Sequence, residues 1–138
     1  MNLSENFRLN ELLRSDAANR LKVVEQYTPS QAVIENLRKL VVNILQPLRN
    51  HLGKSIRVTS GFRCKRLNGL IGGARNSQHT EGKAADIEVD GMTNEELMKV
   101  IIDLDLPYDQ VINEYEPNGW VHISFDEKRN RKQILKIN

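Results

Sequence analysis

The chain has 138 residues, the size of one ordinary domain, and its 39% apolar and 28% charged residues exclude a disordered protein. Its 20 basic and 18 acidic side chains balance to +2, which argues against a protein that grips nucleic acid over its whole surface. A single cysteine excludes an internal disulfide framework and a cysteine-rich zinc module.

The sequence has no apolar run close to the roughly 20 residues of a membrane span. Its first residues also lack the basic and then apolar pattern of a signal peptide. We therefore expect a protein that is made in the cytoplasm and has no membrane partner.

Residues 1–28 are mixed in character and are expected to form an N-terminal capping segment. Within them, Leu9, Leu12 and Leu13 predict a short amphipathic turn that covers the core. No repeat or linker divides the chain, so we expect residues 1–138 to form a single domain.

The strongest predicted helix begins at Thr28, a candidate N-cap. Pro29 would take the first helical position and Gln31 would complete a capping box. Apolar residues then recur at helical spacing. Pro47 is expected to kink or shorten this helix, and Gly53 to end it.

Short segments with alternating apolar residues predict strands at 56–59, 84–89, 110–114 and 120–125, with 133–137 as a candidate edge strand. Two further helices are predicted between strands. One lies within residues 62–72 with Leu67, Leu70 and Ile71 facing inward, and the other opens with a capping box at Thr93. This order predicts an α+β fold with a small, largely antiparallel sheet flanked by helices.

Three polar residues stand where predicted strands and loops could bring them together. Asp86 and His122 lie on the non-core faces of two strands, and His79 lies in a polar loop seven residues before Asp86. If the strands are neighbours, two imidazoles and one carboxylate meet in one cleft and provide the protein ligands of a catalytic zinc site. By spacing alone, each residue is more often solvent-facing or simply hydrogen-bonded.

Residues 77–86 read Ser-Gln-His-Thr-Glu-Gly-Lys-Ala-Ala-Asp and match the pattern SxHxxGxAxD. This pattern resembles the metal motif of the zinc D-Ala-D-Ala carboxypeptidases and related endopeptidases, the peptidase M15 family. Residues 120–122 are similar to that family's closing metal motif, and residues 58–63 to its strand-turn-arginine segment. The resemblance is nearest to short phage and prophage members and implies a Hedgehog/DD-peptidase-like fold.

The resemblance implies Zn2+ as the cofactor, with His79, Asp86 and His122 as its ligands. It also implies that Arg63 contacts substrate or stabilises the developing oxyanion, because a guanidinium offers two donors to one anionic group. Ser77 is expected to hydrogen-bond within the loop, orient His79 and contribute to substrate binding, or else to be an ordinary loop serine.

The general base departs from the family pattern. Several relatives place an acidic residue three positions before the last histidine ligand, where this chain has Gly119. Glu114 is the predicted substitute and would move a proton from the attacking water to the leaving amine. Glu116 is the alternative base, and Glu114 could instead only orient a ligand. Trp120 is expected to line the cleft and contact substrate, or to cover the sheet edge.

We therefore expect a zinc-dependent peptidase that hydrolyses peptidoglycan stem peptides with metal-activated water, as a D-Ala-D-Ala carboxypeptidase or an endolysin-type endopeptidase. The alternative is a non-catalytic zinc protein that binds the cell wall or serves in phage assembly. A monomer is expected. Such an enzyme would reach the wall after release from the cell or within a phage particle.

Residues 128–132 form a basic cluster, Lys-Arg-Asn-Arg-Lys. Such a run is most often a solvated turn, but it could attract anionic wall polymers or nucleic acid. The nearly balanced net charge and the absence of an aromatic platform argue against a nucleic-acid partner.

Overall fold

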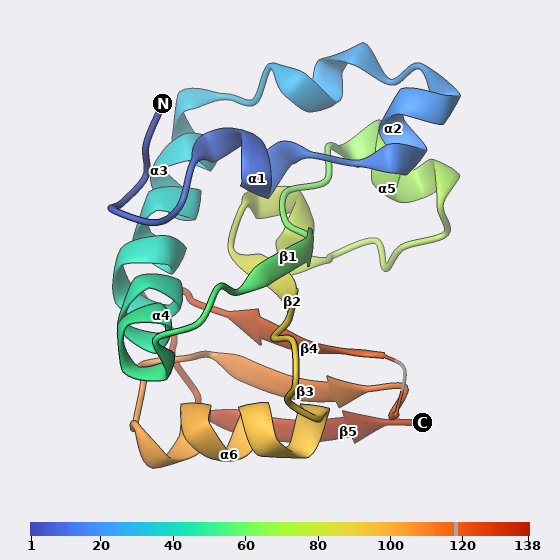
Figure 1. Cartoon of the computed structure of the whole chain (residues 1–138). Coiled ribbons are helices and arrows are strands. Elements are labelled where there is room, and N and C mark those ends of the chain that lie inside the picture. The colour runs from blue at the N-terminus through green and yellow to red at the C-terminus, as the bar shows by residue number, and fades with distance from the viewer. Residues whose placement is uncertain (118) are drawn as a thin grey trace.

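The structure is a computed structural model that describes residues 1–117 and 119–138 (Figure 1). Within these residues, five strands form one sheet in the order β1-β2-β4-β3-β5. The strands are β1 (Arg57–Ser60), β2 (Ala84–Glu88), β3 (Gln110–Glu114), β4 (Trp120–Ser124) and β5 (Gln133–Ile137). Only the β3–β5 pair is parallel, so the expected α+β fold with a largely antiparallel sheet is confirmed.

In Figure 1 the helical segments lie above, to the left of and below the sheet. They are α1 (Leu9–Leu13), α2 (Asp16–Leu21), η1 (Val24–Tyr27), α3 (Gln31–Leu40), η2 (Val41–Leu45), α4 (Gln46–Leu52), α5 (Lys65–Leu70), η3 (Gln78–Glu81) and α6 (Asn94–Asp103). The segments α3, η2 and α4 follow one another directly, and α6 packs against β3 and β4. Among the described helices, none has the length and apolar character needed to span a membrane.

The long helical run begins two residues later than predicted. Ser30 is the N-cap of α3, and its hydroxyl accepts a hydrogen bond from the backbone N–H of Val33. Thr28 instead ends η1, where its hydroxyl donates to the Glu25 carbonyl. The serine after Pro29 therefore satisfies the helix N-terminus, and the prediction of Thr28 as the cap is wrong.

Pro47 is expected to kink or shorten the helix, and the structure instead has a wider helical turn just before it. The chain forms the π-helical turn η2 directly before α4 and then continues helically past the proline. A proline ring crowds the carbonyl four residues earlier, and the wider turn provides room for it. The helix ends at Gly53, which has the left-handed φ of 64°, as predicted.

The prediction that Leu70 and Ile71 face inward is wrong. Leu67 is 1% exposed, whereas Leu70 and Ile71 are 56% and 42% exposed. Helix α5 has only six residues and packs on a small cluster that includes Ala18 and Val23, so it buries one apolar side chain.

The sheet has one apolar and one polar face because successive side chains of a strand point in opposite directions. Ala85, Ile87, Val121 and Ile123 are fully buried in the main core, which also contains Leu37, Leu40, Ile44 and Leu48 of the helical run. Each fully buried leucine stabilises the fold by roughly 1.5–3 kcal/mol. The opposite face is left to the polar residues of β2, β3 and β4.

Candidate metal centre and its cleft

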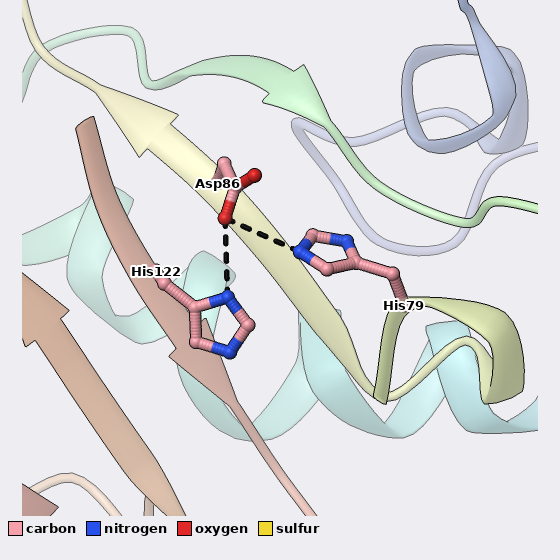
Figure 2. A group of neighbouring side chains, drawn as sticks. All are labelled: His79, Asp86 and His122. Atoms are coloured by element: carbon pink, nitrogen blue, oxygen red, sulfur yellow. Dashed lines mark hydrogen bonds and ion pairs between the residues drawn. The ribbon is translucent and has the colours of Figure 1, made fainter. Parts of the chain in front are cut away.

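Asp86 and His122 are direct partners across the antiparallel pair of β2 and β4. Cross-strand partners point to the same face, so both side chains project from the polar side of the sheet. The Nδ1 atom of His122 lies 3.1 Å from Oδ1 of Asp86, a contact drawn as a dashed line in Figure 2. The strand register therefore places two of the three predicted ligands together.

His79 arrives at the same carboxylate from the short helix η3. Ser77 caps that helix, since its hydroxyl accepts a hydrogen bond from the His79 backbone N–H at 3.2 Å. Gly82 ends it with a φ of 76°, a conformation that favours glycine. The chain then enters β2, and Nε2 of His79 lies 3.3 Å from Oδ1 of Asp86 (Figure 2).

The opposite nitrogen of His79 is held by the backbone. Nδ1 lies 2.7 Å from the Gly61 carbonyl oxygen. Because a carbonyl oxygen only accepts, Nδ1 is the protonated nitrogen, and the lone pair of Nε2 faces Asp86. A hydrogen bond of this kind is the usual way in which a protein orients a histidine ligand.

The three side chains fit a divalent transition metal. One possible ligand atom from each of His79, Asp86 and His122 lies within 4.8 Å of the others, and all three residues are buried. Two ligands at about 2.1 Å from a tetrahedral ion are about 3.4 Å apart. The two nitrogen–oxygen distances of 3.1 and 3.3 Å are close to this spacing.

Asp86 is ionised at neutral pH, which is the form in which a carboxylate binds a metal ion. Burial raises the pKa of Asp86, but the hydrogen bond from His122 and the nearness of both imidazoles outweigh burial and lower this pKa below its usual range. An ionised carboxylate beside two imidazole nitrogens attracts a cation.

Arg63 lies in the turn between β1 and α5, close to the histidine. Its backbone N–H donates to the His79 carbonyl oxygen at 3.1 Å. Burial lowers the pKa of its guanidinium, against the opposing charges of Asp86 and Glu114. Its Nε atom is buried and has no hydrogen-bond partner within the part of the chain that the structure describes, so it retains a donor for a bound group.

Gln26 supports this turn from the N-terminal segment, a role that the sequence analysis missed. The residue is fully buried, and its side chain donates to the carbonyls of Leu13 and Phe62, each at 2.7 Å. It also accepts from the Cys64 backbone N–H at 2.9 Å. Residues 1–28 therefore do more than cover the core, because they brace the turn that carries Arg63.

The two candidate bases have different surroundings. Glu114 lines a cleft of about 720 Å³ that also contains the three candidate ligands, Arg63, Ser77 and Trp120. The indole N–H of Trp120 donates to a Glu114 carboxylate oxygen. Glu116 instead pairs with Lys136 at 3.4 Å. Of the two glutamates, Glu114 is therefore the one placed beside the candidate metal site.

Gly119 occupies a position that has no room for a side chain. A Cβ atom built there would lie 1.8 Å from the Glu114 carbonyl oxygen. The acidic residue that the resemblance leads us to expect at this position could not be accommodated by this backbone. A base in this chain has to come from another position.

Gln78, which lines the cleft, and Asp109, which is buried behind it, form a second polar centre that was not predicted from the sequence. Asp109 has no exposed surface and accepts from Gln78 at 2.9 Å and from Arg131 at 2.8 and 3.0 Å. A signal for Gln78 was available, since it adjoins His79 in the ten-residue motif. Asp109 precedes an apolar strand and gives no comparable sequence signal.

Comparison with known proteins gives one family. A family model described as Peptidase M15 matches residues 5–124, which include every candidate ligand, Arg63 and Glu114. No curated protein matches the chain.

Proposed function

The chain belongs to the peptidase M15 family, and from this premise we propose that it is a zinc-dependent peptidase that hydrolyses peptidoglycan stem peptides. The observation that carries the proposal is the meeting of His79, Asp86 and His122 in a cleft that also contains Glu114 and Arg63. A wall substrate would be reached after release from the cell or from within a phage particle.

The donor set supports zinc over harder cations. Two imidazole nitrogens and one carboxylate oxygen are typical of catalytic zinc sites, whereas Mg²⁺ and Ca²⁺ prefer oxygen ligands throughout. Three protein ligands leave one tetrahedral position for water or substrate. When bound, zinc lowers the pKa of water to about 7 and polarises a carbonyl group.

Glu114 is proposed as the general base. Its carboxylate would take a proton from the attacking water and return it to the leaving amine. The hydrogen bond from Trp120 fixes the direction of one carboxylate oxygen and leaves the other for the proton. Trp120 would also form part of the wall against which the peptide lies.

Arg63 is proposed to stabilise the oxyanion that forms when water adds to the scissile carbonyl. The guanidinium is partly buried, and its charge acts more strongly there than in bulk water. The same group could hold a terminal carboxylate, as a carboxypeptidase requires. Ser77 would act by keeping His79 in place through its cap.

The test is digestion of purified cell wall and of synthetic stem peptides, with mass analysis of the products. We expect new peptide termini, and loss of activity with a chelator that zinc restores. Release of one terminal D-alanine identifies a carboxypeptidase, and release of an internal fragment identifies an endopeptidase. Hydrolysis that persists after the metal is removed would contradict the proposal.

A second candidate is a zinc protein that binds wall peptides without hydrolysing them. The observation that favours it is Gly119, which replaces the family's acidic residue in a space that excludes any side chain. Glu114→Gln separates the two candidates. For an enzyme, this variant should lose about 10²- to 10⁴-fold in kcat and retain its zinc, while Glu116→Gln retains activity. If the wild-type protein binds wall fragments but does not cleave them, the binding protein is the better description.

A further inference from the structure

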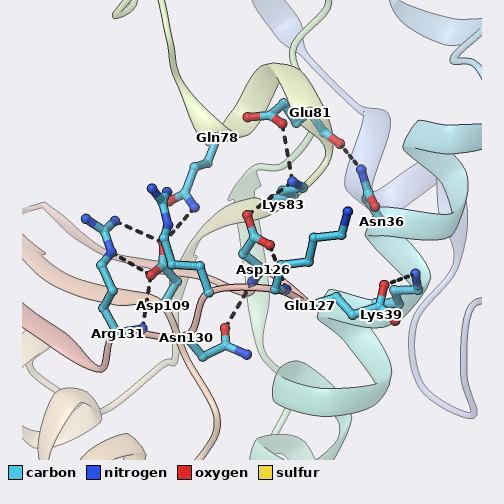
Figure 3. A network of polar contacts seen from close by, with 12 residues as sticks. Asn36, Lys39, Gln78, Glu81, Lys83, Asp109, Asp126, Glu127, Asn130 and Arg131 are labelled. Carbon is cyan, nitrogen blue, oxygen red and sulfur yellow. Dashed lines mark hydrogen bonds and ion pairs between the residues drawn. The ribbon is translucent and has the colours of Figure 1, made fainter.

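Two arginines of the basic segment 128–132, Arg129 and Arg131, line the same cleft as the candidate metal site. Figure 3 shows Arg131 and Gln78 converging on Asp109. Arg131 makes two short hydrogen bonds to Asp109, whereas Nη2 of Arg129 remains 3.7 Å from the same carboxylate. The segment is therefore more than a solvated turn.

This end of the cleft carries more positive than negative charge. Two guanidinium groups share the single carboxylate of Asp109, which also accepts from Gln78 and from the Arg131 backbone. The side chains of Arg129 and Arg131 are 57% and 41% exposed, so both remain open to solvent and to a bound group. Among the described residues, Arg131 is held by its hydrogen bonds to Asp109, while the contact of Arg129 with the same carboxylate is long and leaves donors for another anion.

Gln78 adds a buried acceptor in the same cleft. Its amide nitrogen is used by Asp109, which leaves the carbonyl oxygen Oε1 as the free end of the group. Oε1 is buried and accepts no hydrogen bond within residues 1–117 and 119–138. A bound group that brings an N–H donor would remove this deficit.

The strand register indicates how far the β3 residue next to Asp109 lies from the candidate metal site. Ile112 pairs with His122, which in turn pairs with Asp86, so these residues mark the metal row. Gln110 lies two residues before Ile112 on the same face of β3 and also lines the cleft. It directly follows Asp109, the residue that binds Arg131. Two residues of a strand span roughly 7 Å, about the length of two residues of an extended peptide.

We propose that Arg129 and Arg131 form a carboxylate subsite for the stem peptide, about two residues from the scissile bond. Gln78 Oε1 accepts a peptide N–H beside it. This inference rests on the proposed function and names a specificity determinant of the same cleft. Stem peptides offer two sources of a suitable carboxylate, the α-carboxylate of γ-linked D-glutamate and the C-terminal carboxylate.

The probe is the pentapeptide L-Ala-γ-D-Glu-L-Lys-D-Ala-D-Ala, with its two isomeric monoamides. One monoamide lacks the D-glutamate α-carboxylate and the other lacks the terminal carboxylate, so both have the same net charge. Binding is measured by calorimetry on zinc-loaded protein carrying Glu114→Gln, so that hydrolysis contributes no heat. The test variant is Arg129→Gln, which leaves the Arg131–Asp109 pair in place.

We expect Arg129→Gln to weaken binding of the parent peptide about five- to ten-fold. Arg129→Gln should not weaken binding of the monoamide that lacks the carboxylate recognised by Arg129. The monoamide whose binding is insensitive to this substitution therefore identifies which of the two carboxylates occupies the subsite. Lys128→Gln is the matched control, because it removes the same charge from the neighbouring residue, which lines a different cavity. This control should bind all three peptides like the parent protein.

Equal effects of Arg129→Gln and Lys128→Gln, or equal effects of Arg129→Gln on all three peptides, would overturn the subsite. Hydrolysis of the pentapeptide by the wild-type protein is measured separately. If the pentapeptide is cleaved but Arg129→Gln affects binding of all three peptides equally, the subsite fails and the proposed function stands. If the parent peptide neither binds nor is cleaved, both fail.

Discussion

Contacts with neighbouring residues place two of the predicted ligands, and for His79 they also fix which ring nitrogen faces the candidate metal site. The Gly61 carbonyl assigns Nε2 of His79 to the site, and the β2–β4 register sets His122 opposite Asp86. Loss of one imidazole leaves too few ligands for tight zinc binding, because the fourth position is already open.

At the residue scale we predict that His122→Ala abolishes stoichiometric zinc binding. The wild-type protein should retain about one zinc per chain after dialysis, and the variant should retain almost none. His51→Ala is the matched control, because His51 is an exposed residue near the end of α4, away from the cleft. Metal analysis by mass spectrometry provides the measurement, and equal zinc loss in both variants would contradict the assignment.

At the scale of secondary structure, the hairpin of β3 and β4 carries both Glu114 and His122. Gly119 allows this hairpin to close tightly, because a Cβ atom would collide with the Glu114 backbone carbonyl. The same close approach keeps the carboxylate and the imidazole on adjacent strands.

We therefore predict that Gly119→Ala destabilises the protein by about 1–3 kcal/mol, as is usual for overpacking. Gly69→Ala is the control, since a Cβ there meets no atom within 4 Å and the residue lies in α5. It should leave the protein unchanged or stabilise it by roughly 0.5–1 kcal/mol. Urea unfolding measures both free energies. A Gly119→Glu variant should likewise fail to supply an effective base.

Asp109 joins three elements, since it precedes β3 and contacts Gln78 of η3 and Arg131 before β5. Burial raises the pKa of Asp109, but the hydrogen bonds and charge of Arg131, with the bond from Gln78, lower it overall. Folding therefore favours the ionised form. The resulting stabilisation is complete above the unfolded-state pKa of about 3.9 and disappears as pH falls through the lower folded-state pKa.

Asp109→Asn should accordingly cost roughly 1–3 kcal/mol at pH 7, because the buried amide N–H₂ of the new side chain would face the donors of Gln78 and Arg131 and leave them unpaired. The difference from the wild-type protein should shrink below about pH 4. Asp103→Asn is the control, since the pair of Asp103 with Lys99 is exposed and its loss should change stability by less than about 0.5 kcal/mol. Denaturant unfolding at pH 7 and pH 3 gives both values. A cost that stays constant between these pH values would contradict the role of the ionised group.

At the scale of the whole molecule, the candidate centre links a helical turn to the middle of the sheet. Its ligands come from η3, β2 and β4, and the helical run packs behind those strands. An ion that binds only the folded chain stabilises all of these elements together.

We predict that zinc removal lowers the melting temperature by roughly 10 °C, which corresponds to about 2.7 kcal/mol at a hundred-fold excess of zinc over its Kd. Calorimetry with and without chelator measures the shift. The His122→Ala variant should melt at the same temperature in both conditions. A chelator effect of equal size in that variant would show that the metal acts elsewhere.

Much of the fold could be predicted from local sequence patterns. The strands follow from alternating apolar residues, and α6 follows from the Thr93–Glu96 capping box, which is present in the structure. The start of α3 was misplaced because Thr28 and Ser30 are both good caps, and only tertiary context selects between them. The burial of Leu70 was misjudged because spacing does not reveal how small the neighbouring cluster is.

For the candidate site, the sequence indicated the ligands but not the residues that hold them in place. The ten-residue motif indicated His79 and Asp86, but the contacts of Gly61, Gln26 and Asp109 join residues far apart in the chain. Such contacts depend on packing and on backbone carbonyls, which carry no sequence signature. The two arginines of the basic segment could likewise be assigned to the cleft only once β5 was placed beside β3.

Two hydrogen bonds between His79 and the turn that carries Gly61 and Arg63 restrict how this protein can diverge. The Arg63 N–H donates to the His79 carbonyl, and the His79 ring donates to Gly61 two residues before the arginine. Inserting even one residue into either turn would separate the arginine from the histidine. Length variation among homologues should therefore concentrate in segments 72–76 and 127–130, which lie outside these two turns and contain cleft-lining residues. Changes there can alter substrate preference without moving Arg63 or His79.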